Sequence, residues 1–310
     1  MNELIKYLSN IDYRLLAILS AFFGAISDIM ARTILKNINT NIQKQEDHKI
    51  KAQDILGLNF LIMTGTLAIL SPCFFQIDVK ANTMFGMSTT IPIVIFVSLL
   101  DLVANYYYFK SFENCEVSIA TPILSLSPGF VFILSWIFLG DSFNIIQFFI
   151  ALCIIFGVIL LSMEKINNEA INTSNKLYPP IIASVLFALS AIPTKYLLVN
   201  NLINAPTLYE IRGGIIGLFA IMYFGSGIEK LNNNHFKHLF IRSIFVIIQW
   251  ICLYLSLSLG NAGISITLSR ITPVFALIIV ITLLTEKITS KKIITAISVI
   301  IMVYLINIFG

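Results

Sequence analysis

An arginine three residues before a proline, in the stretch "LSRITP", could bind an anion. Arg270 precedes Pro273, and a proline lacks a backbone N–H and clashes with the carbonyl four residues back. Freed carbonyls beside a permanent cation predict a substrate-binding site, because a guanidinium binds a carboxylate or phosphate through two parallel hydrogen bonds. The alternative is a structural ion pair between Arg270 and an acid such as Asp101.

A second group of polar side chains falls on one face of a predicted helix. Asp101, Asn105 and Tyr108 follow the spacing of successive helical turns. A carboxylate removed from water can take up a proton near neutral pH, so Asp101 is the leading candidate for proton coupling. Asn105 and Tyr108 are candidates for substrate binding. The alternatives are an interhelical hydrogen bond or salt bridge for Asp101, and a place in the interfacial aromatic belt for Tyr108.

Two interpretations fit a charged pair in the first apolar segment. Asp28 and Arg32 are four residues apart, the spacing of an ion pair on one helical face. Either Asp28 carries a proton and Arg32 meets an anion, or the two neutralise each other. Lys195 matches Arg32 later in the chain, where Ala191 replaces the acid. An unpaired lysine is hard to explain as structure, so Lys195 is predicted to contact substrate.

The remaining candidates for substrate binding are Arg212, Gln249 and Trp250, with packing as the alternative for Trp250. Gln249 shares a helical face with Arg242 and Ser256, because the three are spaced by seven residues.

Other signatures of chemistry are weak. The stretch "GGIIG" at 213–217 contains a GxxxG pattern, which predicts close helix contact. The sequence has no nucleophile–base signature, phosphate-binding glycine loop or metal motif. We therefore expect no catalytic residue, no cofactor and no metal.

The composition shows which elements must position these residues. Of 310 residues, 57% are hydrophobic and 12% charged, with a mean hydropathy of +0.89. A soluble domain is about 45–50% apolar and about 25% charged, so the chain is predicted to be an integral membrane protein with the lipid bilayer as its solvent. Its net charge of +4 is spread among loops, and without a basic tract we expect no nucleic-acid partner.

Ten apolar segments are long enough to cross a bilayer as helices. They lie at about 14–36, 54–75, 90–112, 116–139, 143–163, 179–199, 206–227, 238–259, 262–284 and 290–309.

The fourth and ninth segments repeat one pattern. "LSLSPGFVFILSWIFLGDSF" and "LSRITPVFALIIVITLLTEKI" align at an offset of 145 residues, which places Pro128 over Pro273 and Asp141 over Glu286. The fold class is therefore predicted as all-α, with ten transmembrane helices in two five-helix repeats at 1–165 and 166–310. An odd number of spans inverts the second repeat, which suits alternating access. Pro122, Pro128 and Pro273 are expected to flex their helices.

These features resemble the drug/metabolite transporter superfamily, in its EamA-like branch. The resemblance implies a transporter of amino acids, nucleotide-linked compounds, cofactors or other metabolites. Proteins of this family often have an arginine early in the second and seventh spans. Arg212 fits the seventh span, but the second has Asn59, and Arg270 lies where the family usually has an uncharged residue.

Two arguments about orientation disagree. Thirteen lysines and arginines, Arg242 among them, fall in loops on one side of the ten spans, against three on the side of the termini. The positive-inside rule then places the termini outside the cell. The family resemblance implies cytoplasmic termini.

The expected function is secondary transport of a small polar metabolite with a negative group, in a bacterial cytoplasmic (inner) membrane. An amino acid, an organic acid and a phosphorylated or nucleotide-linked compound all fit. Protons or a counter-substrate are further expected partners, while the oligomeric state is left open. The alternatives are a receptor or scaffold, which would need no substrate-sized cavity, and a membrane-embedded enzyme, which would change its ligand covalently.

Overall fold

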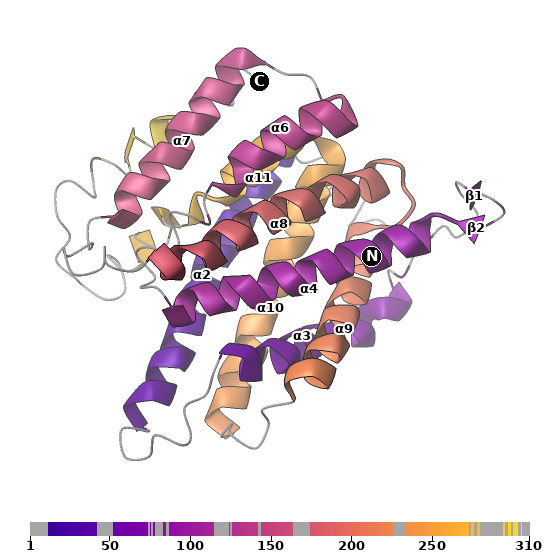
Figure 1. The fold of residues 1–310 in the computed structure, drawn as a ribbon, viewed down its shortest axis with the longest axis vertical. Helices are drawn as coiled ribbons and strands as arrows, with labels where there is room; N and C mark the ends of the chain where they lie inside the picture. The colour runs from indigo at the N-terminus through magenta and orange to yellow at the C-terminus, as the bar shows by residue number, and fades with distance from the viewer. Residues whose placement is uncertain are drawn as a thin grey trace.

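The computed structural model describes residues 12–41, 52–73, 83–114, 124–163, 174–225 and 233–275 with short gaps, and scattered residues elsewhere. These ranges form helices joined by short connections (Figure 1). The helices are α2 (Tyr13–Asn41), α3 (Ala52–Leu70), η2 (Ser71–Cys73), α4 (Thr90–Asn114), α6 (Ser127–Leu139), α7 (Ile145–Met163), α8 (Ser174–Val199), α9 (Ala205–Phe224), α10 (Asn233–Leu259) and α11 (Ala262–Ser269). A small hairpin of β1 (Thr83–Met84) and β2 (Met87–Ser88) lies outside the bundle.

Local sequence sets several helix ends. Asn204 caps α9, because its side-chain oxygen accepts from the backbone N–H of Thr207 at 2.9 Å. Asn261 caps α11 in the same way through Ile264, at 3.2 Å. Gly140 ends α6 in the left-handed conformation, with φ at 63°, which glycine adopts without steric cost.

The helices have the length and surface of membrane spans. By length and composition, five stretches can each cross a bilayer: Ile55–Cys73, Thr90–Ser111, Tyr178–Val199, Ala205–Phe224 and His235–Leu259. Large apolar side chains cover the outside of the bundle, with Phe138 at 70% and Met222 at 81% exposure. Such a surface needs lipid rather than water around it. The predicted all-α membrane fold is confirmed.

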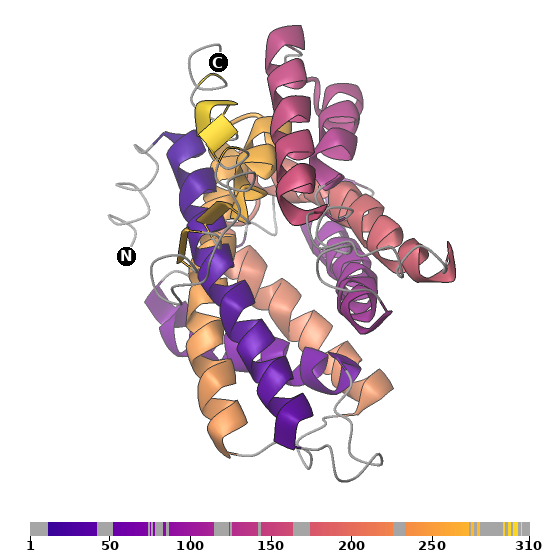
Figure 2. The same ribbon diagram turned by 90° about the vertical axis from the view of Figure 1, so that its left-hand side faces the viewer.

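Contacts between the two halves come in matched pairs. If α2, α3 and α4 correspond to α8, α9 and α10, their contacts across the halves have counterparts. The α4–α8 contact (Figure 1) matches α10–α2 (Figure 2), and α4–α9 matches α10–α3. The pair α3–α9 maps onto itself. This exchange pattern is what a pseudo-two-fold axis between inverted repeats produces.

Glycines allow α3 and α9 to approach closely. A Cβ atom on Gly217 would lie 2.8 Å from Leu61, one on Gly213 would lie 2.7 Å from Thr64, and one on Gly57 would lie 2.6 Å from Ile221. The close contact predicted from "GGIIG" is confirmed. At these glycines, side chains of one helix therefore pack directly against the backbone of the other.

The fourth and ninth spans are interrupted. We expected a continuous helix over 116–139, but α6 begins at Ser127, after a turn at Leu126. Pro128 lies in the first turn of α6, where a missing N–H costs no hydrogen bond, and Leu126 before it keeps right-handed helical dihedral angles. The role of Pro128 in flexing this span stays a prediction. α11 ends at Ser269, and a turn follows at Ile271.

The two interruptions are related by the repeat, because Leu126 and Ile271 are separated by the same 145 residues as the prolines. Pro122 and Pro273 lie outside the described residues, as does the predicted boundary between 165 and 166.

Candidate functional site

A cavity of about 140 Å³ lies where the two halves meet. Helices from both halves contribute to it, which is the position expected for a transporter site. Its described lining comprises Ser20, Ser27, Asn59, Phe60, Met63, Asn105, Tyr108, Phe109, Leu124, Phe187, Tyr209, Arg242, Val246, Gln249, Trp250, Leu253, Ser269, Arg270 and Thr272. Five of the predicted substrate-binding residues lie together here: Arg270, Asn105, Tyr108, Gln249 and Trp250.

Arg242 is a buried cation in the cavity wall. Its Nη1 donates to Oδ1 of Asn59 at 2.6 Å, and its Nε donates to the carbonyl oxygen of Ser27 at 3.2 Å. Both acceptors are neutral. A charged side chain inside a membrane costs about 2.5–3.5 kcal/mol on insertion scales. This cost makes Arg242 a candidate for a functional residue. The seven-residue spacing places Arg242 on the same helical face as Gln249, whereas its assignment to the loop cations is wrong, because the structure buries it in α10.

Arg270 lies at the interruption that follows α11. Its backbone N–H closes the last turn by donating to the carbonyls of Ile266 and Thr267. Its guanidinium carbon lies 5.9 Å from the ring centre of Phe187, within cation–π range. Arg270 lines both the large cavity and an adjoining one of about 30 Å³, so the broken helix places this cation between two internal spaces.

Arg212 and Asp101 form a buried ion pair between α9 and α4. Nη2 of Arg212 donates to Oδ2 of Asp101, and Nη1 donates to Oγ1 of Thr194 at 2.8 Å. The guanidinium also lies 5.2 Å from the centre of the Tyr254 ring. Of the two interpretations of Asp101, the interhelical salt bridge is therefore present, and its partner is Arg212 instead of Arg270. Neither residue of the pair is in the described lining of the large cavity.

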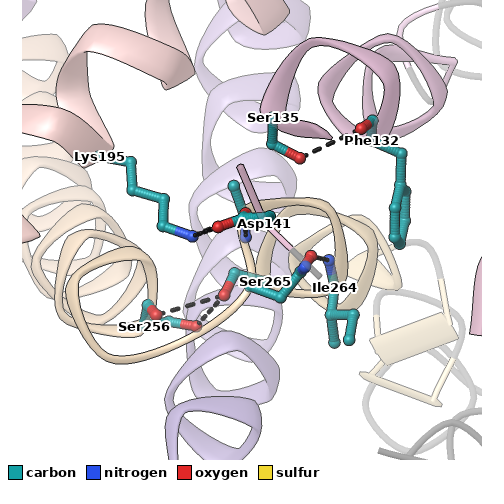
Figure 3. A network of polar contacts seen from close by, with 9 residues as sticks. Phe132, Ser135, Asp141, Lys195, Ser256, Ile264 and Ser265 are labelled. Carbon is teal, nitrogen blue, oxygen red and sulfur yellow. Dashed lines mark hydrogen bonds and ion pairs between the residues drawn. The ribbon is translucent and has the colours of Figure 1, made fainter. Parts of the chain in front are cut away.

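Lys195 also has a carboxylate partner, so the description of it as unpaired is wrong. Its Nζ donates to both oxygens of Asp141, at 2.6 and 2.7 Å. Oδ2 of Asp141 accepts in addition from the backbone N–H of Ala262 at 3.2 Å, at the start of α11 (Figure 3). Asp141 was recognised only as part of the repeat. Its carboxylate joins the end of α6 to α8 and α11.

Two serines tie further helices into the same end of the bundle. Oγ of Ser256 lies 2.8 Å from Oγ of Ser265, linking α10 to α11 (Figure 3). Ser256 also donates to the carbonyl oxygen of Tyr13 at 2.7 Å, in the first turn of α2. With the Lys195–Asp141 ion pair, these contacts hold α2, α6, α8, α10 and α11 together; we call this group the closed end.

Aromatic rings form one wall of the cavity. Trp250 stacks on Tyr209 with ring centres 6.2 Å apart and planes 14° from parallel. Tyr254 meets both rings edge to face, and the Tyr209 hydroxyl bonds to the sulfur of Met63 at 3.2 Å. The tyrosines were not predicted, because aromatic residues are common throughout the chain and only the fold gathers these three.

The remaining predicted residues are placed only by their backbone. Asp28 and Arg32 lie on α2, but their side chains are outside the described part of the chain. Their proposed roles stay predictions.

Comparison with known proteins finds a family model and solved structures that match this chain. The model of the EamA-like transporter family matches residues 13–163 and 180–308. A solved structure titled "Crystal structure of protein" is similar with a TM-score of 0.72 and 10% sequence identity, covering 95% of this chain and 96% of that chain. At this identity the likeness shows the fold alone. No curated protein matches the sequence.

Proposed function

The chain belongs to the EamA-like transporter family, and from that premise we propose that it is a secondary transporter of a small metabolite with a negative group. The observation that carries this proposal is the cavity between the halves, with Arg242 and Arg270 in its wall. Guanidinium groups bind carboxylate and phosphate through paired, charge-assisted hydrogen bonds. Amide and hydroxyl groups of Asn105, Gln249 and Tyr108 supply further polar contacts around the same space.

The cavity volume favours the smaller candidates. A protein cavity of about 150 Å³ accommodates one benzene molecule, and the space here is about 140 Å³. An organic acid or amino acid is of this size, whereas a nucleotide-linked compound needs much more room. The stacked face of Trp250 and Tyr209 would cover the apolar part of such a substrate.

Alternating access is supported by the way the halves contact each other. The matched contacts across the halves can exchange when one repeat rocks against the other. In the conformation described, Lys195 and Asp141 fasten the closed end. The turns at Leu126 and Ile271 lie beside the site and are the proposed flexing points of the fourth and ninth spans.

Asp28 and Asp101 are the proposed carriers of a coupling proton, and obligate exchange for a counter-substrate would need neither. A bacterial cytoplasmic membrane and a division into repeats at 1–165 and 166–310 complete the proposal.

The test is an uptake screen in proteoliposomes, with labelled anionic, zwitterionic and neutral metabolites and with or without a pH gradient. We expect time-dependent uptake of at least one small anion or zwitterion, and slower uptake by Arg270→Gln. Uptake of neutral apolar compounds alone would overturn the substrate class. Binding without uptake would favour a receptor, and a changed product would favour an enzyme.

A further inference from the structure

Resting on the proposed function, we infer that the substrate is an amphipathic monocarboxylate. Its carboxylate binds Arg242, and its apolar body lies against Met63, Tyr209 and Trp250. The anion is thus assigned to a cation on α10, whereas the sequence pointed first to Arg270. A substrate with an ammonium group at the end remote from its carboxylate is the principal competitor.

Arg242 is oriented by neutral acceptors and keeps donors for a ligand. Its Nη1 donates to Oδ1 of Asn59 at 2.6 Å, and its Nε donates to the carbonyl oxygen of Ser27 at 3.2 Å. A guanidinium has five N–H groups in a rigid fork, so three remain. These are enough for a carboxylate bound by two parallel hydrogen bonds. The two protein acceptors fix the plane of the fork before a ligand arrives.

The corresponding junction in the other half shows which charge a ligand would supply. There, Arg212 on α9 pairs with the carboxylate of Asp101 on α4, whereas α3 and α10 are joined by Asn59 and Arg242. An amide takes the place of the carboxylate, so the junction of Arg242 has a net positive charge. Asn59 and Arg242 both line the large cavity. A carboxylate bound there would neutralise the cation in surroundings of low dielectric constant.

The large cavity extends along one face of α10. Its lining includes five residues of this helix at helical spacing: Arg242, Val246, Gln249, Trp250 and Leu253. The eleven residues from the first to the last correspond to about three helical turns. Arg242 is the first of this row, so the cation lies at one end of the face that α10 presents to the cavity.

A series of contacts in the cavity wall leads from this cation to the aromatic rings. Arg242 donates to Asn59, whose Nδ2 lies 3.9 Å from the sulfur of Met63. The Tyr209 hydroxyl donates to the same sulfur at 3.2 Å, and the Tyr209 ring stacks on Trp250. The wall therefore changes from charged to apolar between Arg242 and Trp250.

The apolar part of this wall is unsuited to a second charge. We call it the apolar wall, and it consists of Met63, Val246, Tyr209, Trp250 and Leu253. The hydroxyl of Tyr209 is used by Met63. Moving an ammonium group from water to such surroundings is costly unless a polar partner is supplied. A carboxylate with a hydrocarbon chain matches both the cation and the apolar wall.

The experiment compares three ligands with the same four-carbon chain: butyrate, butyramide and 4-aminobutyrate. Butyramide replaces the carboxylate by a neutral group of similar shape, and 4-aminobutyrate adds an ammonium group at the other end. The protein has two tryptophans, and Trp136 lies on the outer surface. In a Trp136→Phe background the fluorescence of Trp250 therefore reports binding in the cavity.

Wild-type protein in this background should prefer butyrate. We expect butyrate to bind about 10- to 100-fold more tightly than butyramide, the effect of hydrogen bonds to a charged group. It should also bind at least about tenfold more tightly than 4-aminobutyrate, because the apolar wall offers no compensation for the lost hydration of the ammonium group.

Two variants test the assignment of the carboxylate to Arg242. Arg242→Gln should bring the dissociation constants of butyrate and butyramide within about threefold of each other. Asn59→Asp places a carboxylate beside Arg242, as at the other junction. It should weaken the binding of butyrate by about tenfold or more, yet the protein should unfold at the same or a higher temperature, because the buried cation gains a partner. Loss of folding cannot produce this combination.

Arg270→Gln is the matched control, because it removes the other arginine of the described cavity lining. The proposed function expects this variant to slow uptake. Its preference for butyrate over butyramide should nevertheless stay within about threefold of the wild-type value, because the carboxylate is bound by Arg242.

Each outcome decides a different claim. If butyramide binds wild-type protein as tightly as butyrate, or if Arg270→Gln removes the preference as fully as Arg242→Gln, the assignment to Arg242 is overturned and the transporter proposal stands. If 4-aminobutyrate binds as tightly as butyrate, the apolar end of the substrate is overturned. If none of the three compounds binds, the substrate class is wrong, and the proposed function fails only when the uptake screen is negative as well.

Discussion

Nη1 of Arg242 donates a hydrogen bond to Oδ1 of Asn59 at 2.6 Å, while at the matching junction Nη2 of Arg212 donates to a carboxylate oxygen of Asp101. The fold therefore contains two similar arginine junctions with different charge. The Arg212–Asp101 junction pairs opposite charges and lines a small cavity of about 10 Å³, whereas the Arg242 junction is cationic and lines the large cavity. The first junction links α9 to α4 through paired charges, and the second is the one that we propose to meet the substrate.

The neutral junction should show strong energetic coupling. Asp101→Asn or Arg212→Gln alone leaves one buried charge without its partner, which costs about 3–5 kcal/mol. The double variant leaves no such charge, so its loss of stability should be smaller than the sum of the two single losses. Thermal unfolding of the purified proteins in detergent measures this. Additive losses would mean that the pair does not act as a unit.

The closed end should open when its ion pair is broken. Asp141→Asn weakens the contact with Lys195 and the contact with the N–H of Ala262. Ser190 is a reporter, because it is buried and lines the small cavity beside Arg270. With the four native cysteines replaced, Ser190→Cys should react with an impermeant thiol reagent from one side of the membrane only. Adding Asp141→Asn should allow reaction from the opposite side.

The exchanged pair Lys195→Asp with Asp141→Lys is the control for this experiment. It restores opposite charges, but a lysine at 141 cannot accept a hydrogen bond from the Ala262 N–H. One-sided labelling should therefore return only in part. Full accessibility from both sides in the protein with an intact ion pair would contradict a closed end.

Two glycines three residues apart should respond differently to alanine. A Cβ atom on Gly217 would lie 2.8 Å from Leu61, while the nearest atom to one on Gly214 is 3.5 Å away, an ordinary contact. Gly217→Ala should destabilise the protein by about 1–3 kcal/mol, the typical cost of overpacking. Gly214→Ala should be neutral or stabilising by up to about 1 kcal/mol, because alanine favours helix. Equal shifts in unfolding temperature would show that α3 and α9 are not in close contact.

Trp250 should limit the length of the substrate that the cavity accepts. Trp250→Leu removes one face of the stack with Tyr209 and enlarges the cavity. The ratio of initial uptake rates for a six-carbon over a four-carbon carboxylate should then rise by about tenfold, a usual effect of pocket size on specificity. Trp136→Leu, on the outer surface, is the matched control and should leave the ratio unchanged. The same ratio in both variants would show that Trp250 does not limit the length of the substrate.

The repeated pattern in the sequence predicts the fold, because the length and apolarity of each segment are enough to specify a membrane-spanning helix. Apolar length specifies helices that cross a bilayer, and the ordered proline and acidic matches indicate duplication. The interruption at Leu126 was missed, because a proline at 128 is compatible both with a kink inside a helix and with the first turn of a new one.

The site could be predicted only in part. Arg270, Asn105 and Trp250 were found because a polar or aromatic residue in an apolar segment is conspicuous and normally faces the interior. The sequence did not reveal which cation is neutralised. Asp101 lies 111 residues from Arg212, and Asp141 lies 54 residues from Lys195. Such pairings depend on helix packing, so Lys195 and Arg242 were judged from their neighbours in sequence rather than in space.

Counterflow in proteoliposomes tests the central claim most directly. Vesicles loaded with an unlabelled small anion or zwitterion from the uptake screen are diluted into a trace of the same compound in labelled form, and the label inside is followed with time. A carrier that alternates around the cavity predicts a transient accumulation of label above its equilibrium value, which Arg242→Gln and Asn59→Asp should both reduce. Entry of label to equilibrium without such a peak, for every anion or zwitterion tested, would contradict transport by alternating access.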